Sequence, residues 1–278
     1  MSTSFETLTL NKDGAILKVT INNTRSEINL FLQETVVELT QLVTLLQNDT
    51  STKVVIFKSG NPEFFSAHYD IFPTPGEPDP STPGTAASNG KVFLNMSNLP
   101  QPVIAMVDGP ARGIANEFLA ACDMRFASTN ARFGNFEATL GLHPGAGGVA
   151  WMPLHIGRAR AIEFVLSGND LDPKTAEEYG YVNKAFNTSA EMQDYVEKLA
   201  KRIALFPLDG LASIKKTVTD TIQPKAEQIA IEGAEWDRLV AQKLQSELVA
   251  KFVTLSKNFT DIEFELHLPQ EVVEVYTI

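Results

Sequence analysis

Several features are scarce in this chain, and each shortage excludes a class of protein. Cys122 is the single cysteine, so no internal disulfide framework can form, and a reducing compartment suits the sequence. No apolar run approaches the length of a membrane span, so we expect no membrane partner. Basic runs are missing too. Lys+Arg 23 against Asp+Glu 34 gives a net charge of −11, which argues against nucleic acid as a partner. The ends carry no secretory, transit or peroxisomal pattern, which predicts a cytoplasmic protein.

The 278 residues, 44% of them hydrophobic, are enough for a large core. Hydrophobic periodicity predicts pairs of strands that alternate with helices over the first two thirds, and almost only helices afterwards. The predicted strands cover 5–10, 15–21, 53–58, 64–68, 102–107, 123–127, 131–134 and 181–186. The predicted helices cover 29–47, 91–98, 158–167, a segment opened by the N-cap Asp172, and 189–257 with a break at 206–207.

One segment fits no regular element. Pro73 to Gly90 contains five prolines, and its composition predicts a mobile surface loop or a flap over a binding pocket.

The stretch from Val107 to Asp123 is the most informative part of the chain. A buried strand runs into a glycine- and proline-containing turn and then into a helix, so free backbone N–H groups converge where a negative charge could be held. Glu117 falls in the first turn of that helix, where an ordinary dipole-compatible Glu is also expected. Glu137 follows within a glycine-rich segment, 134–148, which lacks the residues of a phosphate loop or a dinucleotide fingerprint.

Three blocks, in matching order and spacing, carry a resemblance to a known family. They are 65–70 (Phe-Ser-Ala-His-Tyr-Asp), 107–123 and 133–148 (Phe-Gly-Asn-Phe-Glu to Gly-Ala-Gly-Gly). Over roughly residues 5 to 190 the chain resembles the crotonase superfamily, the enoyl-CoA hydratase/isomerase fold. The resemblance implies an α/β fold, a spiral of repeated ββα units (1–200, catalytic) with a helical C-terminal region (201–278) that completes the active site and mediates oligomerisation.

The resemblance also implies a mechanism. The backbone N–H groups of Ala67 and Ile114 would form an oxyanion hole for an acyl-thioester carbonyl. Glu117 and Glu137 match the two glutamates of the hydratases, and retention of both favours an enoyl-CoA hydratase that adds water syn across C2=C3. We assign Glu117 to the water and Glu137 to the C2 proton. The alternatives are a Δ3,Δ2-enoyl-CoA isomerase, a C–C lyase, or a non-catalytic protein that binds acyl-CoA.

Departures from the family pattern fall beside the expected site. His68 and Tyr69 replace small residues, and His68 is interpreted equally well as a packing residue or as a polar contact near the thioester. With Asp70, Gly113 and Arg25 they form the predicted substrate-binding set, and Arg25 would meet a phosphate of coenzyme A.

The resemblance predicts no metal and no cofactor apart from the coenzyme A of the substrate. Lys251 and Lys257 are candidates for its adenine end. A homotrimer, or a dimer of trimers, is expected through the helical last third, although an internal core face is equally compatible with the pattern. The apolar candidates for that interface are Ile229, Ile231, Leu239, Leu244, Leu248 and Phe252.

Overall fold

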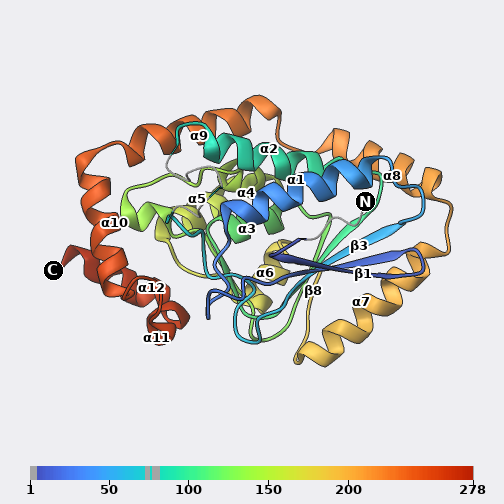
Figure 1. Ribbon diagram of the computed structural model, residues 1–278, viewed down its shortest axis with the longest axis horizontal. Helices are drawn as coiled ribbons and strands as arrows, with labels where there is room; N and C mark the ends of the chain where they lie inside the picture. The colour runs from blue at the N-terminus through green and yellow to red at the C-terminus, as the bar shows by residue number, and fades with distance from the viewer. Residues whose placement is uncertain (1–4, 73–75, 77–81, 278) are drawn as a thin grey trace.

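The computed structural model describes residues 5–72, 76 and 82–277. A large sheet of six strands crosses it in the order β1-β2-β3-β4-β6-β8, so neighbours in the sheet follow one another along the chain (Figure 1). Its first pair is antiparallel and all later pairs are parallel. The strands are β1 (Leu8–Asp13), β2 (Ile16–Ile21), β3 (Val54–Ser59), β4 (Val103–Val107), β6 (Met124–Ala127) and β8 (Lys184–Ala185).

A second, smaller layer of extended chain accompanies the large sheet. Its only two-residue-or-longer ladder in the described residues joins β5 (Pro110–Arg112) to β7 (Arg132–Gly134), and single bridges extend it at Ser66↔Ala111, Phe133↔Leu171 and Phe31↔Tyr69. Each repeat of the spiral therefore contributes one strand to the large sheet and one extended segment to the small layer. A helix then leads the chain back to the large sheet. This arrangement confirms the predicted spiral of ββα units and excludes a doubly wound sheet.

Two predicted strands are shorter than expected. The strand expected over 64–68 reduces to the single bridge at Ser66. The strand expected over 181–186 keeps only β8, because the N–H of Tyr181 bonds back to the Ala176 carbonyl to close the preceding helix after Gly180.

Helices fill the rest of the structure. They are α1 (Gln33–Gln47), α2 (Thr85–Ser97), α3 (Ile114–Ala120), α4 (Gly148–Ile156), α5 (Arg158–Ser167), α6 (Pro173–Tyr179), α7 (Ser189–Ala204), α8 (Leu208–Thr221), α9 (Ala226–Val240), α10 (Lys243–Leu255), α11 (Ile262–Leu266) and α12 (Leu268–Glu271), with the 3₁₀ turns η1 (Glu137–Leu140) and η2 (Val272–Tyr276). The predicted cap of α6 is confirmed, since Asp172 accepts the N–H groups of Lys174 and Thr175. Within 5–72, 76 and 82–277, no helix is long and apolar enough to cross a bilayer.

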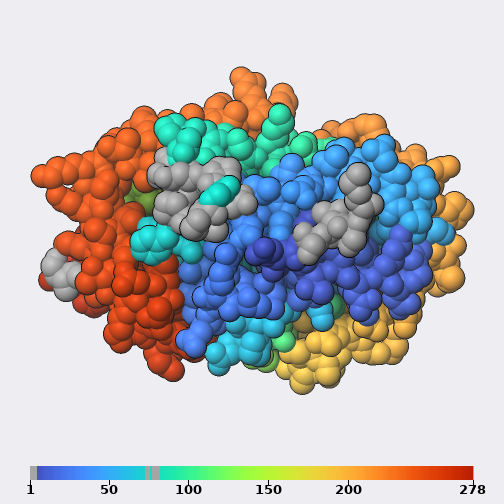
Figure 2. Space-filling view, viewed as in Figure 1, coloured from blue at the N-terminus to red at the C-terminus, as the bar shows by residue number. Residues whose placement is uncertain are grey.

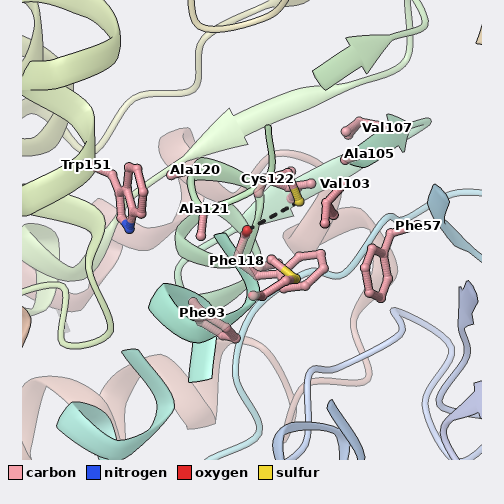
Figure 3. Packing of buried hydrophobic residues seen from close by; sticks show 14 of the residues in the cluster. Phe57, Phe93, Val103, Ala105, Val107, Phe118, Ala120, Ala121, Cys122 and Trp151 are labelled. Carbon is pink, nitrogen blue, oxygen red and sulfur yellow. Dashed lines mark hydrogen bonds between the residues drawn. The ribbon is translucent and has the colours of Figure 1, made fainter. Parts of the chain in front are cut away.

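The core lies on both faces of the large sheet. Helices α1, α2 and α3 cover one face, while α7 covers the other with Met192, Val196 and Ala200. Phe118 of α3 sits at the centre of the first layer, 5.0 Å from Phe57 and 5.6 Å from Phe93 between ring centroids (Figure 3). Such edge-on aromatic pairs add to the stability that apolar burial supplies.

Cys122 ends the same buried segment. Its thiol lies 3.6 Å from the Phe118 carbonyl (Figure 3), and burial raises its pKa to about 12. The thiol therefore stays protonated, as expected of a packing residue.

The proline-rich segment, Pro73 to Gly90, ends within a helix. Residues 73–75 and 77–81 of the predicted flap lie outside the described residues. Its last part is helical, because α2 begins at Thr85 after Gly84, whose φ of 89° ends the preceding turn. Gly90 brings α2 against Ala146 so closely that a Cβ would lie 2.9 Å from the carbonyl oxygen. The prediction that no regular element lies between residues 73 and 90 is therefore wrong from residue 85 onward.

The C-terminal helices return over the spiral. Helix α9 runs along α2 (Figure 1), and a Cβ on Gly233 would lie 2.5 Å from the Cβ of Ala87. Helices α10 to α12 form one end of the molecule (Figure 2). Of the six apolar interface candidates, Ile229, Leu248 and Phe252 are buried within the chain, Leu239 is half-buried, and Ile231 and Leu244 are exposed. The division into domains at residue 200, which lies inside α7, stays a prediction.

Candidate active site

A cavity of about 230 Å³ lies between α3, η1, α2 and the C-terminal helices. Six residues of the predicted site line it: His68, Tyr69, Gly113, Ile114, Glu117 and Glu137. Its apolar wall consists of Ile71, Phe136, Leu140, Leu142, Trp236, Val240, Val249, Phe252 and Phe259. Ala86 and Asn89 of α2 also border it, so part of the predicted flap segment does reach the cavity.

Glu117 stands in the first turn of α3 and is only 3% exposed. Its Oε1 accepts the N–H groups of Ala146 at 2.8 Å and Gly148 at 2.9 Å. Burial raises the pKa of Glu117 to about 7, although these two hydrogen bonds act in the opposite direction. The carboxyl group therefore changes its charge near neutral pH.

Glu137 opens η1 and reaches the same cavity. It is 7% exposed, and Asn135 Nδ2 donates long hydrogen bonds to its two oxygens, at 3.3 and 3.4 Å. Burial, followed by the charge of Glu117, raises the pKa of Glu137 to about 8. The cavity thus contains two carboxyl groups that titrate one after the other as a pair.

Two glycines leave the space that the two carboxyl groups occupy. Gly113 has φ 54° and ψ −128°, a conformation that residues with a Cβ rarely adopt. A Cβ there would also lie 3.2 Å from Glu137 Oε1. At Gly148 a Cβ would lie 3.1 Å from Glu117 Oε1.

The two predicted oxyanion donors differ in the structure. Ile114 is the first residue of α3 and lines the cavity, and its N–H donates no hydrogen bond in the described part of the chain. The N–H of Ala67 instead donates to the Ile28 carbonyl at 3.1 Å, and Ala67 does not line the cavity. The assignment of Ala67 therefore needs correction, because its amide is paired inside the protein.

His68 shows both features that the sequence left open. Its ring is 3% exposed and packs edge-on against Phe259, at 4.7 Å between centroids, and it also lines the cavity. Nδ1 lies 2.9 Å from the Tyr69 carbonyl, and Nε2 lies 3.2 Å from Oε1 of Glu265. Burial alone would lower the pKa of His68, but the charge and hydrogen bond of Glu265 outweigh burial and raise it.

Glu265 belongs to α11 and was not predicted from the sequence. It is fully buried, and its Oε2 has no hydrogen-bond partner among the described residues. Arg112 positions the helix that carries it: Nη1 donates to the Glu265 carbonyl at 2.7 Å, and the same guanidinium pairs with Asp170 at 2.8 and 2.9 Å. These partners are far apart in the sequence, so no local pattern indicates them.

Another buried carboxyl group, Glu232 of α9, was also missed. It is 4% exposed, and its Oε2 accepts the N–H groups of Gly147 at 3.1 Å and Val149 at 3.2 Å. Burial, followed by the charge of Glu117, raises the pKa of Glu232 to about 8.

Of the other predicted substrate contacts, Asp70 and Arg25 do not line the cavity. Asp70 accepts the N–H of Phe72 at 2.9 Å, and partial burial raises its pKa. Arg25 pairs with Glu34 near the surface. The hydroxyl of the cavity-lining Tyr69 donates to Gln33.

The two candidate lysines have partners within the C-terminal region. Lys257 pairs with Asp261 at 2.6 Å, and Lys251 donates to the Val275 carbonyl at 3.0 Å. Across residues 5–72, 76 and 82–277, no group of three or more His, Cys, Asp or Glu side chains is placed to hold a metal ion.

Solved structures share this architecture. A Streptomyces avermitilis protein assigned to the enoyl-CoA hydratases is 32% identical, with a TM-score of 0.86 and 98% of each chain covered. An enoyl-CoA hydratase from Bacillus anthracis is 26% identical, with a TM-score of 0.72, and the match covers 90% of this chain and 96% of the other. The spiral is therefore that of a crotonase fold.

Sequence comparisons identify the family. The family model for enoyl-CoA hydratase/isomerase matches residues 11–261. The short-chain-enoyl-CoA hydratase of Clostridium acetobutylicum is 30% identical over 194 residues, 70% of this chain and 74% of the relative. The carnitinyl-CoA dehydratase of Escherichia coli K12 is 30% identical over 226 residues, 80% of this chain and 84% of the relative. The chain belongs to the enoyl-CoA hydratase/isomerase family, which acts on acyl-CoA thioesters, and the resemblance inferred from the three blocks is confirmed.

Proposed function

We propose that this protein is an enoyl-CoA hydratase that adds water across the C2=C3 bond of a 2-enoyl-CoA thioester. The observation that carries the proposal is the pair of buried carboxyl groups, Glu117 and Glu137, in one cavity with pKa values of about 7 and 8. Between these values one group is ionised and the other protonated, as hydration requires of a base and an acid.

Ionised Glu117 removes a proton from a water molecule, whose oxygen forms a bond to C3. The C2=C3 π electrons move toward the thioester, and the negative charge that develops on its oxygen is stabilised by the Ile114 N–H, a contribution of about 3 kcal/mol for one such donor. Protonated Glu137 then gives its proton to C2. Solvent restores the two protonation states, so the net change is one added water.

Two parts of this scheme follow from the arrangement of the donors. Glu117 and Glu137 line one cavity, and we propose that they deliver the oxygen and the proton to the same face of the double bond, which gives syn addition. We propose that the second oxyanion donor comes from the cavity-lining segment His68–Tyr69 rather than from Ala67. The apolar wall suits an acyl chain without charge.

The relatives support this choice of reaction. Their names, short-chain-enoyl-CoA hydratase and carnitinyl-CoA dehydratase, describe the addition and the removal of water. An isomerase needs only one carboxyl group to move a proton, so two positioned carboxyl groups favour hydration.

Substitution of each carboxyl group tests the proposal. Glu117→Gln and Glu137→Gln keep the size of the side chains, and each should lower the hydration kcat by roughly 10²–10⁴-fold. The double variant should lose far less than the product of the two effects, because the groups act on one water. The assay follows loss of enoyl-thioester absorbance with a panel of 2-enoyl-CoA esters, and Glu163→Gln on the exposed side of α5 is the matched control.

Two outcomes would contradict hydration. If Glu117→Gln kept full activity while Glu137→Gln abolished it, a single carboxyl group would do the chemistry, as in isomerisation. If both variants matched the parent on every ester that the parent converts, neither carboxyl group would take part. If the parent itself converted none, the non-catalytic alternative would replace the proposal.

The pH dependence provides an independent check. Activity should rise with pH as Glu117 ionises and fall as Glu137 loses its proton, which gives a bell-shaped kcat/KM profile with apparent pKa values of about 7 and 8. In Glu117→Gln the residual activity should lose the acid limb, and the basic limb should move to lower pH because the charge of Glu117 no longer raises the pKa of Glu137. A profile that is flat from pH 6 to pH 9 in the parent would refute the assignment of roles.

We also propose the homotrimer, or dimer of trimers, that the resemblance implies. Helix α8 supports it, because none of its residues is buried in the chain and it exposes Ile214 and Val218. Light scattering at micromolar concentration should give a multiple of three, and a monomer would contradict the proposal.

A further inference from the structure

Four consecutive backbone N–H groups are shared between two carboxyl groups. Glu117 Oε1 accepts those of Ala146 and Gly148, at 2.8 and 2.9 Å. Glu232 Oε2 accepts those of Gly147 and Val149, at 3.1 and 3.2 Å. The two side chains come from α3 and α9 and approach the same turn in alternation, although they are far apart in the sequence.

The turn at residues 146–149 has no capping side chain of its own. It opens α4, whose N-cap is Gly147 with φ 118° and no capping side chain. Glycines leave the backbone free to adopt other conformations, and the first N–H groups of a helix need acceptors from elsewhere. Glu232 is the acceptor that the fold supplies on one side of the turn, and Glu117 is the acceptor on the other.

Stability does not account for Glu232. Its Oε1 has no hydrogen-bond partner, and no cation forms an ion pair with it, in the part of the chain that the structure describes. The charge of Glu117 acts on Glu232, while His155 of α4 is turned to the Ala120 carbonyl. A buried carboxyl group in such surroundings costs free energy, so its hydrogen bonds to the turn are what it contributes.

We infer that Glu232 is a positioning residue for Glu117: it fixes the 146–149 turn so that the Ala146 and Gly148 N–H groups hold the carboxylate of the base. The consequence for turnover rests on the proposed hydration, whereas the consequence for the titration of Glu117 does not.

The hydrogen bonds from the turn lower the pKa of Glu117 against the effect of burial. If the turn loosens, that lowering is lost and Glu117 ionises at higher pH. Any negative charge that Glu232 carries would also raise the pKa of Glu117, so the variants that test the turn have to be matched in charge.

Two variants of equal charge separate the two effects. Glu232→Gln and Glu232→Leu both remove the charge, but only Gln keeps an oxygen that can accept the Gly147 and Val149 N–H groups. In Glu232→Leu we expect kcat to fall roughly 10–100-fold, as for a misplaced catalytic group, with little change in KM. Glu232→Gln should recover most of that loss of kcat. The acid limb of its pH profile should occur at lower pH than the acid limb of Glu232→Leu. Glu232→Met is a second variant without an acceptor, and Glu235→Leu, on the same helix with 42% of its side chain exposed, is the control.

A measurement without turnover completes the test. The amide proton resonances of Ala146 and Gly148 report the titration of Glu117, and their midpoint should be higher in the Leu or Met variant than in the Gln variant. If these midpoints differ as expected but the parent hydrates no enoyl-CoA, the proposed function fails and the positioning role stands. If the Gln and Leu variants share one midpoint and one kcat, or if Leu only lowers thermal stability, the inference is overturned.

Discussion

The His68–Glu265 pair offers a test of how charge is buried beside the cavity. Both side chains are almost fully buried, and Nε2 lies 3.2 Å from Oε1. Glu265→Gln removes the charge partner and leaves the imidazolium in an apolar surrounding of phenylalanine rings. Removing one member of a buried pair costs about 3–5 kcal/mol, which is a large part of a typical 5–15 kcal/mol of stability.

The pH dependence identifies the charge as the cause. The pKa of His68 is raised in the folded protein. A raised pKa means that the stabilisation is fully present below the unfolded value of about 6.5 and is lost as pH rises through the folded value. Glu265→Gln should therefore lose more stability relative to the parent at pH 6 than at pH 9. The titrations of Glu117, Glu137 and Glu232 occur in both proteins and cancel in this difference.

Urea unfolding followed by circular dichroism measures the effect. With a slope of about 3 kcal/mol per molar urea, a loss of 3 kcal/mol at pH 6 moves the midpoint by about 1 M. In the double variant His68→Phe, Glu265→Leu both charges are replaced by apolar groups, and much of the loss should return. A loss that is equal at pH 6 and pH 9, or below about 0.5 kcal/mol at both, would refute a charged pair.

Two further substitutions test the walls of the cavity. Gly113→Ala should destabilise the protein by about 1–3 kcal/mol because of its backbone conformation, and it should lower kcat because the Cβ would lie 3.2 Å from Glu137 Oε1. Thermal unfolding and turnover measured on the same sample separate the two effects, and an unchanged kcat would contradict the placement of Glu137. Phe252→Ala should cost about 3–5 kcal/mol and enlarge the cavity that the ring lines, so kcat/KM should shift toward longer enoyl-CoA esters, whereas an unchanged chain-length preference would contradict an acyl site there.

The sequence predicts well what is encoded within short stretches. The buried runs of β3 and β4 contain only apolar residues on both faces, so their strands follow from local composition. The step from strand to turn to helix that places Glu117 is also local, since Gly113 supplies the one conformation that the turn needs. Even the cap at Asp172 lies in consecutive residues. The family resemblance adds the pairing of Glu117 with Glu137.

What the sequence does not predict are contacts between distant segments. The N–H of Ala67 donates to the Ile28 carbonyl because the turn that contains Ile28 lies beside the segment of Ala67, and no pattern around Ala67 indicates this. Arg112 is a charged residue within an apolar stretch, which is a signal that a partner must exist. The identity of the partners, Asp170 and the carbonyl of Glu265, depends on where the chain returns.

The C-terminal helices supply buried carboxyl groups that affect the titration of the site, although the spiral provides the site's two glutamates. Glu232 of α9 takes the amides between those that hold Glu117, and Glu265 of α11 holds His68 in the cavity wall. Both are buried carboxyl groups, and both would be costly without the backbone N–H groups or the imidazole that they meet. The N–H groups at the start of α4 and the ring of His68 belong to the spiral. Glu232 and Glu265 therefore meet their hydrogen-bond partners only when the C-terminal helices are docked on the spiral. The docking of α9 and α11 therefore acts on the same groups that set the protonation of Glu117 and the shape of the cavity.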